Sequence, residues 1–219
     1  MSYGEPIALR GQVELDQAAA ATSGDVRRTA EAEFIEKLKA GDEAAFDRLV
    51  AERTGDVYAL LFRLTNDAEE ARDLTQETFL RTFQNINRFR GDADLKTWLY
   101  RIAVNQARNR WRWWRRRRRD ATISLDAGDS HHEKSLGSRL QDRNSTDPEQ
   151  ETLAHEREAL LMAALSSLSN SYRETVILRD IEGLSYEEVA ETLEISIGTV
   201  KSRLARGRNE LRMKLERSL

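Results

Sequence analysis

Apolar residues recur along this chain at the three- and four-residue spacing of helices that bury one face. The first stripe predicts two helical segments separated by a turn at Gly41 and Asp42. Its members are Phe34, Ile35, Leu38, Phe46, Leu49 and Val50. A second stripe follows, made of Val57, Leu60, Leu61 and Leu64. No segment reads convincingly as a strand, so the pattern predicts an all-α protein.

Two further helices are predicted in the N-terminal half. The first spans residues 68–85, because Asn66 and Asp67 offer an N-cap and acids fill its first turn. Its expected core stripe is Ala71, Leu74, Thr75, Phe79 and Phe83, with Thr78 beside it. A loop over residues 86–94 follows, with Gly91 as its pivot. Asp94 can then cap a long helix that runs from Leu95 to about Arg119.

Helical periodicity disappears over residues 120–150 and resumes near Glu151. The next two amphipathic stripes contain Leu153, Leu160, Leu161, Ala164, Leu165 and Leu168, then Tyr172, Val176, Ile177, Leu178 and Ile181. Ser185 and Glu188 form a capping-box pattern that opens a short helix. After a turn at Glu194 to Ser196, a last helix is predicted from Ile197 to about Arg217.

This pattern divides the chain into four parts. Residues 1–33 show little periodicity and are expected to be a disordered arm or, at best, a frayed helix. Residues 34–119 and 152–219 are predicted to be two small helical domains. The acidic, polar segment 120–151 is too long for a loop inside a compact domain, so it is predicted to be a flexible linker.

Charge is strongly segregated along the chain, although the net charge is only −3. Residues 101–119 hold nine Arg and no acid, and residues 196–219 hold seven basic residues against two acids. Between them, residues 120–160 hold ten acids against four basic residues. Two basic blocks separated by an acidic segment suggest two surfaces that face a polyanion.

Composition excludes several classes of function. There is no Cys, which rules out disulfides, Cys-ligated zinc and thiol nucleophiles. His131 and His132 lie in the polar segment without helical metal-ligand spacing, so no metal or cofactor is expected. No catalytic motif appears either, and we expect a protein that is not an enzyme. No apolar run approaches membrane-spanning length and no signal peptide is present, which indicates a cytoplasmic protein.

Residues 185–208 have the pattern of a helix-turn-helix. Val200 and Leu204 would anchor the second helix from its inner face. Hydroxyl and cationic side chains are left to reach phosphates and guanine edges in a major groove: Thr199, Lys201, Ser202, Arg203 and Arg206. The alternative is an ordinary basic surface helix. The capping box, the tight turn and the segregation of inner from outer residues together favour DNA binding.

The predicted helix over residues 95–119 has a second candidate surface. Arg101, Arg108, Arg112 and Arg115 share one face, and three Trp interleave with the Arg run. Arginine supplies phosphate contacts, and aromatic rings offer platforms for unpaired bases. A solvated helix end is the alternative, with Trp98 and Ile102 in the core. For Ile102 the core position is our prediction.

Asp73, Gln76 and Glu77 form a polar and acidic cluster beside the stripe of the predicted helix 68–85. A solvated face and a docking surface for a basic partner both fit this pattern equally well.

Three strings of this sequence together resemble the extracytoplasmic-function (group IV) sigma factors of bacterial RNA polymerase. They are DAEEARDLTQETFLR (67–81), FRGDADLKTWLYRIAVNQARN (89–109) and LSYEEVAETLEISIGTVKSRLARGR (184–208). The resemblance covers roughly residues 34–119 and 152–216. Each string alone is weak, but all three in this order and spacing are highly specific.

The resemblance implies a role for each surface. Asp73, Gln76 and Glu77 match the helix that docks on core RNA polymerase. The segment that would read and open the promoter −10 element holds Phe89, Arg90, Lys96, Trp98, Arg101, Asn105, Arg108 and Asn109. The helix that would read the −35 element holds Thr199, Lys201, Ser202, Arg203 and Arg206. An anti-sigma factor is implied as a further partner, and insertion into a membrane is not expected.

We therefore expect a promoter-specificity subunit that binds core RNA polymerase and promoter DNA and stabilises the melted strand. One alternative is a sigma mimic that sequesters an anti-sigma factor without touching DNA. Such a mimic should have lost cations that this chain keeps, among them Arg101, Arg108, Lys201 and Arg206. A stand-alone repressor, which would bind duplex DNA without polymerase, is a second alternative. Glu194 departs from the family pattern, because it stands at a turn position where Gly is common.

Overall fold

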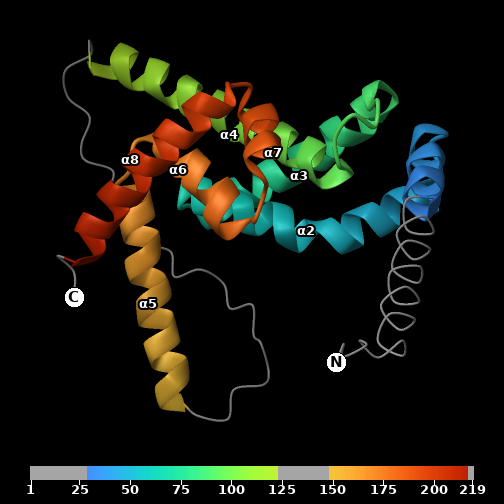
Figure 1. Cartoon of the computed structure of the whole chain (residues 1–219). Coiled ribbons are helices and arrows are strands. Elements are labelled where there is room, and N and C mark those ends of the chain that lie inside the picture. The colour runs from blue at the N-terminus through green and yellow to red at the C-terminus, as the bar shows by residue number, and fades with distance from the viewer. Residues whose placement is uncertain (1–28, 123–147, 217–219) are drawn as a thin grey trace, which may run out of the picture. The chain divides into compact units, whose positions relative to one another are not determined.

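The structure, a computed structural model, describes residues 29–122 and 148–216 (Figure 1). Within these ranges the chain is helical and contains no strand, as the sequence pattern predicts. The chain forms two compact units, one ending at Ala51 and the other beginning at Glu52. The His pair and most of the predicted linker lie outside the described residues, as do residues 1–28.

The first unit contains a helix over residues 29–39 and the start of α2 (Glu43–Thr65). Gly41 has a φ of +77°, a conformation that L side chains rarely adopt, and Asp42 accepts a hydrogen bond from the Ala45 amide at 2.9 Å. The expected turn at Gly41 and Asp42 is therefore present. Residues 29–33, assigned to the arm by sequence, are already helical.

Helix α3 (Ala68–Asn85) begins where predicted, because the Asp67 side chain accepts the Glu70 amide at 3.0 Å. Its buried stripe differs from the expected one at the C-terminal end. Thr82 is fully buried, whereas Phe83 is 55% exposed. The core positions follow the series 71, 75, 78 and 82, and residue 83 lies about 100° around the helix from that stripe. The placement of Phe83 in the core was wrong.

Helix α4 (Leu95–Thr122) follows a 3₁₀ turn, η1 (Ile86–Arg88), and a loop in which Gly91 has a φ of +78°. Asp94 caps the helix, with its carboxylate accepting the Lys96 amide at 2.7 Å. The side chains that α4 buries are Leu95, Thr97, Leu99, Tyr100, Ala103, Val104 and Gln106. Ile102 is only partly buried, so its assignment to the core was wrong.

The C-terminal part contains α5 (Pro148–Ser166), α6 (Asn170–Val176), α7 (Tyr186–Leu193) and α8 (Ile197–Glu216). Helix α5 begins at Pro148, three residues before the expected start, consistent with the preference of proline for a first helical turn. A π-helical turn, η2 (Ile177–Ile181), continues α6 and was not predicted. The chain then turns at Gly183, whose φ is +75°.

Candidate nucleic-acid interface

The turn between α7 and α8 sets the geometry of the helix-turn-helix. The Ser185 hydroxyl accepts the Glu188 amide at 3.1 Å, and the Glu188 carboxylate accepts the Ser185 amide at 2.7 Å, which completes the capping box. Glu194 ends α7 in the left-handed conformation with a φ of +57°. Gly adopts this conformation most readily, so the presence of Glu194 at this turn position strains the backbone.

The outward edge of α8 holds the side chains proposed to read DNA. Val200 and Leu204 are buried, as predicted, and fix the rotation of the helix. Lys201, Ser202 and Arg206 are exposed, while Thr199 and Arg203 are partly exposed. The Ser196 hydroxyl accepts the Thr199 amide at 3.2 Å and so caps the helix. This edge presents two hydroxyls and three cations, the chemistry required to contact phosphates and base edges.

The second surface lies at the start of α4. Trp98 packs its ring against Phe89, with the two centroids 5.4 Å apart, and Phe89 is only 4% exposed. Phe89 therefore supports the loop and Trp98 from within. Lys96, Arg101, Asn105 and Arg108 are partly exposed on α4, whereas Arg90 and Asn109 are exposed. We call Lys96, Arg101 and Arg108 the α4 cationic face.

Acidic groups of the C-terminal helices contact the α4 cationic face. The Arg108 guanidinium donates to both carboxylate oxygens of Glu174, the shortest contact being 2.6 Å. Arg101 pairs with Glu194 at 2.6 Å. The Lys96 ammonium donates to the backbone carbonyl of Glu182 at 3.4 Å, and the Thr97 hydroxyl donates to Glu188 at 3.0 Å.

Glu182 lies at the centre of this contact. Its carboxylate accepts Arg63 and the Tyr100 hydroxyl, both at 2.8 Å. Burial, together with this hydrogen bond to a carboxylate, raises the pKa of Tyr100 far above its ordinary value. Tyr100 is thus a neutral hydrogen-bond donor at neutral pH.

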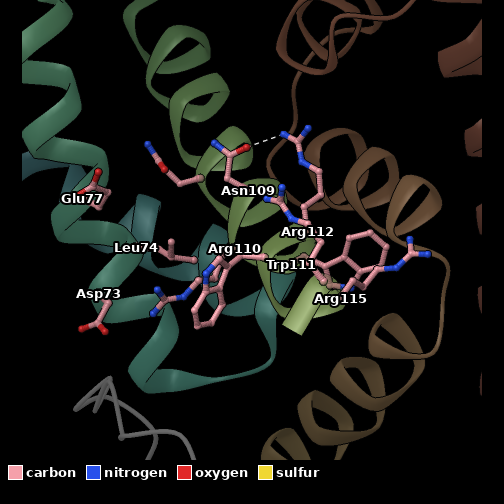
Figure 2. A pocket seen from close by; sticks show the side chains of 11 residues that line it. Asp73, Leu74, Glu77, Asn109, Arg110, Trp111, Arg112 and Arg115 are labelled. Carbon is pink, nitrogen blue, oxygen red and sulfur yellow. Dashed lines mark hydrogen bonds between the residues drawn. The ribbon is translucent and has the colours of Figure 1, made fainter. Parts of the chain in front are cut away.

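The distal part of α4 carries an exposed cluster of Arg and Trp (Figure 2). The Arg115 guanidinium lies 4.6 Å from the centroid of Trp111, and Arg117 lies 4.5 Å from that of Trp113. The Trp113 and Trp114 rings meet edge to face at 4.9 Å. We call residues 110–117 the Arg/Trp segment. Its rings are held by neighbouring cations while large parts of them stay accessible.

A hollow of about 910 Å³ is lined by the Arg/Trp segment and by residues of α3 (Figure 2), and Arg110 of the segment pairs with Glu70 of α3 at 3.1 Å. Asp73 and Glu77 line its α3 side, and Glu77 pairs with Arg81 at 2.7 Å. Gln76 is exposed, and Leu80, one turn after Gln76 and Glu77, is 58% exposed. The three polar residues therefore lie on one exposed stripe that Leu80 extends.

Sequence comparisons identify the family. The profile of Sigma-70 region 2 matches residues 49–119, and that of Sigma-70 region 4 matches residues 158–211. The chain is 35% identical over 179 residues to the RNA polymerase sigma-H factor of Pseudomonas aeruginosa, covering 82% of this chain and 90% of that protein. It is 34% identical over 183 residues to the ECF RNA polymerase sigma-E factor of Haemophilus influenzae, covering 84% and 94%. The chain belongs to the extracytoplasmic-function (ECF) RNA polymerase sigma factors.

Solved structures agree with an ECF sigma factor fold. The sigma factor RpoE in complex with the anti-sigma factor NepR from Bartonella quintana gives a TM-score of 0.58 at 28% identity, covering 78% of this chain and 96% of that one. CnrH in complex with the cytosolic domain of CnrY gives a TM-score of 0.61 at 22% identity, covering 87% and 99%. At 22% identity, the likeness to CnrH supports a shared fold and nothing further.

In sigma-factor terms, the α4 cationic face and the α3 stripe belong to region 2, and the helix-turn-helix belongs to region 4. Sequence reasoning missed the acids that meet region 2, because it treated the acids of each helix as solvated. We call Glu174, Glu182, Glu188 and Glu194 the region 4 carboxylates. The sequence did contain a signal for them, because these acids lie in and around the helix-turn-helix, a motif that was interpreted only through its cationic residues.

Two further observations concern the described part of this sigma factor. None of its helices is long and apolar enough to cross a membrane. No group of three or more His, Asp or Glu side chains is placed there to hold a metal ion.

Proposed function

We propose that this sigma factor binds core RNA polymerase in the cytoplasm and directs it to promoters by reading two DNA elements. Residues 34–119 would act as the region 2 domain and residues 152–219 as the region 4 domain, with 120–151 as the linker. The observation that carries the proposal is the exposed hydroxyl and cationic edge of α8, which follows α7 and its complete capping box in a chain of this family.

Region 4 would place α8 in the major groove of the −35 element. Lys201, Arg203 and Arg206 carry the charge for this contact, while Thr199 and Ser202 supply hydroxyls. A cation that donates two hydrogen bonds to guanine discriminates between bases, whereas one that touches only phosphate does not.

Region 2 would read and open the −10 element with the loop before α4 and the α4 cationic face. Extruding a base from a duplex requires a few kcal/mol, which a shaped pocket can recover. Arg90, Trp98, Asn105 and Asn109 are the side chains we assign to the melted strand, and buried Phe89 would support Trp98.

The Arg/Trp segment would hold the nucleic-acid backbone beside the −10 element. At about 1.5 Å per residue, Arg115 lies about 15 Å further along α4 than Asn105, a distance of about four base pairs at 3.4 Å each. Arginine contacts of this kind supply affinity without base information.

The α3 stripe would dock on a basic surface of core polymerase, through Asp73, Gln76 and Glu77. An anti-sigma factor is a further proposed partner, because the similar sigma factor RpoE of Bartonella quintana is solved in complex with the anti-sigma factor NepR. A sigma mimic fits less well, since Lys201 and Arg206 are kept and exposed. A stand-alone repressor would need tight binding to duplex DNA without polymerase.

Run-off transcription with core polymerase on a promoter library tests the proposal. We expect defined transcripts only when the protein is present. Absence of both polymerase binding and initiation on every template would refute it. Crosslinking to promoter DNA in the polymerase complex would separate a sigma factor from a mimic, which should give no crosslink.

Arg206→Ala should weaken recognition of the −35 element by about 1–3 kcal/mol, because a base-edge contact is lost. Transcription from the preferred promoter should be compared with transcription from promoters altered at −35. Arg212→Ala, which removes an exposed arginine six residues further along α8, is the matched control and should behave like wild type. An equal loss on all sequences would make Arg206 a phosphate contact.

A further inference from the structure

The hollow beside the Arg/Trp segment, which we call the α3/α4 hollow, brings together three kinds of side chain (Figure 2). Its α4 wall includes Gln106, Arg110 and Trp113, which follow one another at i, i+4 and i+7 and therefore share one face of the helix. Leu74, only 6% exposed, adds an apolar patch to the α3 wall. An amide, a guanidinium and an aromatic ring thus line one space of about 910 Å³, a volume within the range of small-molecule sites.

Gln106 is a polar side chain of this wall that the fold itself does not use. It is 7% exposed, and its amide makes no hydrogen bond to any residue in the described ranges 29–122 and 148–216. In those ranges the one fully enclosed side-chain polar atom without a partner is the Thr192 Oγ1, so the Gln106 amide is not sealed in the core and opens on the hollow. A largely buried amide without partners is unfavourable, and a ligand that supplies them gains affinity.

Exposed arginines form the other end of the hollow. Those that line it beyond Arg110 are Arg112, Arg115 and Arg116. Guanidinium groups of this kind bind phosphate through charge-assisted hydrogen bonds. The α3 wall carries Asp73 and Glu77 instead, and Arg81 engages Glu77 at 2.7 Å. The anionic part of a ligand should therefore lie on the distal arginines, and its uncharged part should lie near Leu74 and Gln106.

Trp113 provides a stacking surface within the same hollow. It is 39% exposed, and the guanidinium groups of Arg110 and Arg117 lie 5.9 Å and 4.5 Å from its ring centroid. Indole rings next to cations suit unpaired nucleotides, because every base has a π-face to stack and a phosphate attached to it. The three kinds of side chain therefore match the three parts of a nucleotide contact: stacking, base edge and phosphate.

We propose that the α3/α4 hollow binds an unpaired purine nucleotide, with adenine preferred. The base would stack on Trp113 and meet the Gln106 amide, whose adjacent donor and acceptor complement N7 and N6 of adenine. The phosphates would lie on the distal arginines, away from Asp73 and Glu77. A free nucleoside triphosphate and a nucleotide within single-stranded DNA share this chemistry. The site adds to the proposed function and does not depend on how the −10 and −35 elements are read.

Titration calorimetry with the full chain tests the site directly. The probes are ATP, CTP and inorganic triphosphate, which differ in base while all carry phosphate. We expect ATP to bind about ten-fold more tightly than CTP, which lacks the adenine edge, and more tightly still than triphosphate, which has no base to stack. Equal affinities for the three probes would show that the arginines attract any polyanion, and this would overturn the proposal.

Two variants separate the ring from the amide. Trp113→Leu should weaken ATP binding about ten-fold and leave triphosphate binding unchanged, because only stacking is lost. Gln106→Met keeps a side chain of similar size and should lower the affinity for ATP to that for CTP. ATP bound by Trp113→Leu as tightly as by wild type would contradict the proposal. Since Trp113 is exposed, this variant keeps the test valid even if circular dichroism shows that Gln106→Met has unfolded.

Each variant has a matched control. Trp114→Leu removes an exposed indole of the same segment that does not line the hollow, and Gln84→Met removes an exposed amide of α3 that does not line it either. Both controls should bind ATP like wild type. An equal loss with Trp114→Leu and Trp113→Leu would show that the rings act through the segment in general, and this would refute a site in the hollow.

Competition between ATP and a short single strand of deoxyadenylates distinguishes the two sources of nucleotide. A strand that displaces ATP and binds about ten-fold more tightly, with the same sensitivity to Trp113→Leu, assigns the hollow to unpaired DNA. ATP that the strand fails to displace assigns the hollow to a free nucleotide. If neither probe binds more tightly than triphosphate, the proposal is wrong.

Failure of this site can be told from failure of the proposed function. Promoter-dependent transcription by a holoenzyme whose sigma factor binds neither ATP nor the strand would remove the nucleotide site and leave the sigma function intact. Nucleotide binding that depends on Trp113 and Gln106, without transcription from any template, would retain the site and end the promoter role.

Discussion

Gly207 shows how one residue lets two helices approach closely. It is buried in the interior of α8, where glycine is unfavourable for the helix itself by about 1 kcal/mol relative to alanine. A Cβ at this position would lie 2.9 Å from the Val176 Cγ2 and 3.2 Å from the Tyr172 Cβ. Close packing of α8 on α6 therefore requires the absence of a side chain.

Gly207→Ala should lower the free energy of unfolding by about 1–2 kcal/mol, because overpacking outweighs the gain in helix propensity. Gly55→Ala is the matched control. Gly55 also lies inside a helix, but a Cβ there meets nothing within 4 Å, so that substitution should stabilise by up to about 1 kcal/mol. Urea unfolding measures both, and a stabilised Gly207→Ala protein would contradict the packing argument.

At the scale of elements, the start of α7 depends on a charged cap. The Ser185 amide donates to the Glu188 carboxylate, and this hydrogen bond is the main reason that the pKa of Glu188 is lowered. Because the folded state binds that proton less readily than the unfolded state, ionised Glu188 contributes stability at neutral pH. That contribution is lost as the pH falls through the lowered pKa.

Two variants separate the cap from the charge. Ser185→Ala should lower the free energy of unfolding by about 1 kcal/mol at neutral pH, since it removes the acceptor for the Glu188 amide. Glu188→Gln should be less stable than wild type at pH 7, and the difference should vanish in acid. Thermal unfolding across a pH series checks this, and a difference that persists in acid would show that charge is not the cause.

Helix α3 shows where sequence periodicity is sufficient and where it is not. The Asp67 cap predicted where α3 begins, and the spacing of apolar residues predicted most of its buried stripe. Thr82 and Phe83 are adjacent, and hydrophobicity alone favoured Phe83 for the core. Thr75, Thr78 and Thr82 can be buried because each hydroxyl donates to the carbonyl four residues earlier, which satisfies it without a tertiary partner.

At the scale of the whole molecule, the α3 stripe should decide whether the sigma factor joins polymerase. Glu77→Lys should abolish co-purification with core enzyme, because it reverses charge at the centre of the proposed docking surface, while circular dichroism stays unchanged. Glu191→Lys makes the same change at an exposed residue of α7 and should leave polymerase binding intact. Core enzyme retained by the Glu77→Lys protein would place the docking surface elsewhere.

The sequence by itself determined the helical class, most helix limits and the chemistry of both cationic surfaces. These properties depend on the spacing of apolar residues, on helix caps and on charge, all of which are set by residues that lie close together in the sequence. Only the tertiary structure decided that Arg108 meets Glu174 and that Tyr100 meets Glu182, partners separated by 66 and 82 residues. The tertiary structure also showed why position 207 is glycine, since α6 packs too closely there for a side chain. Such contacts depend on how helices pack, and no local periodicity records which face of one helix meets another.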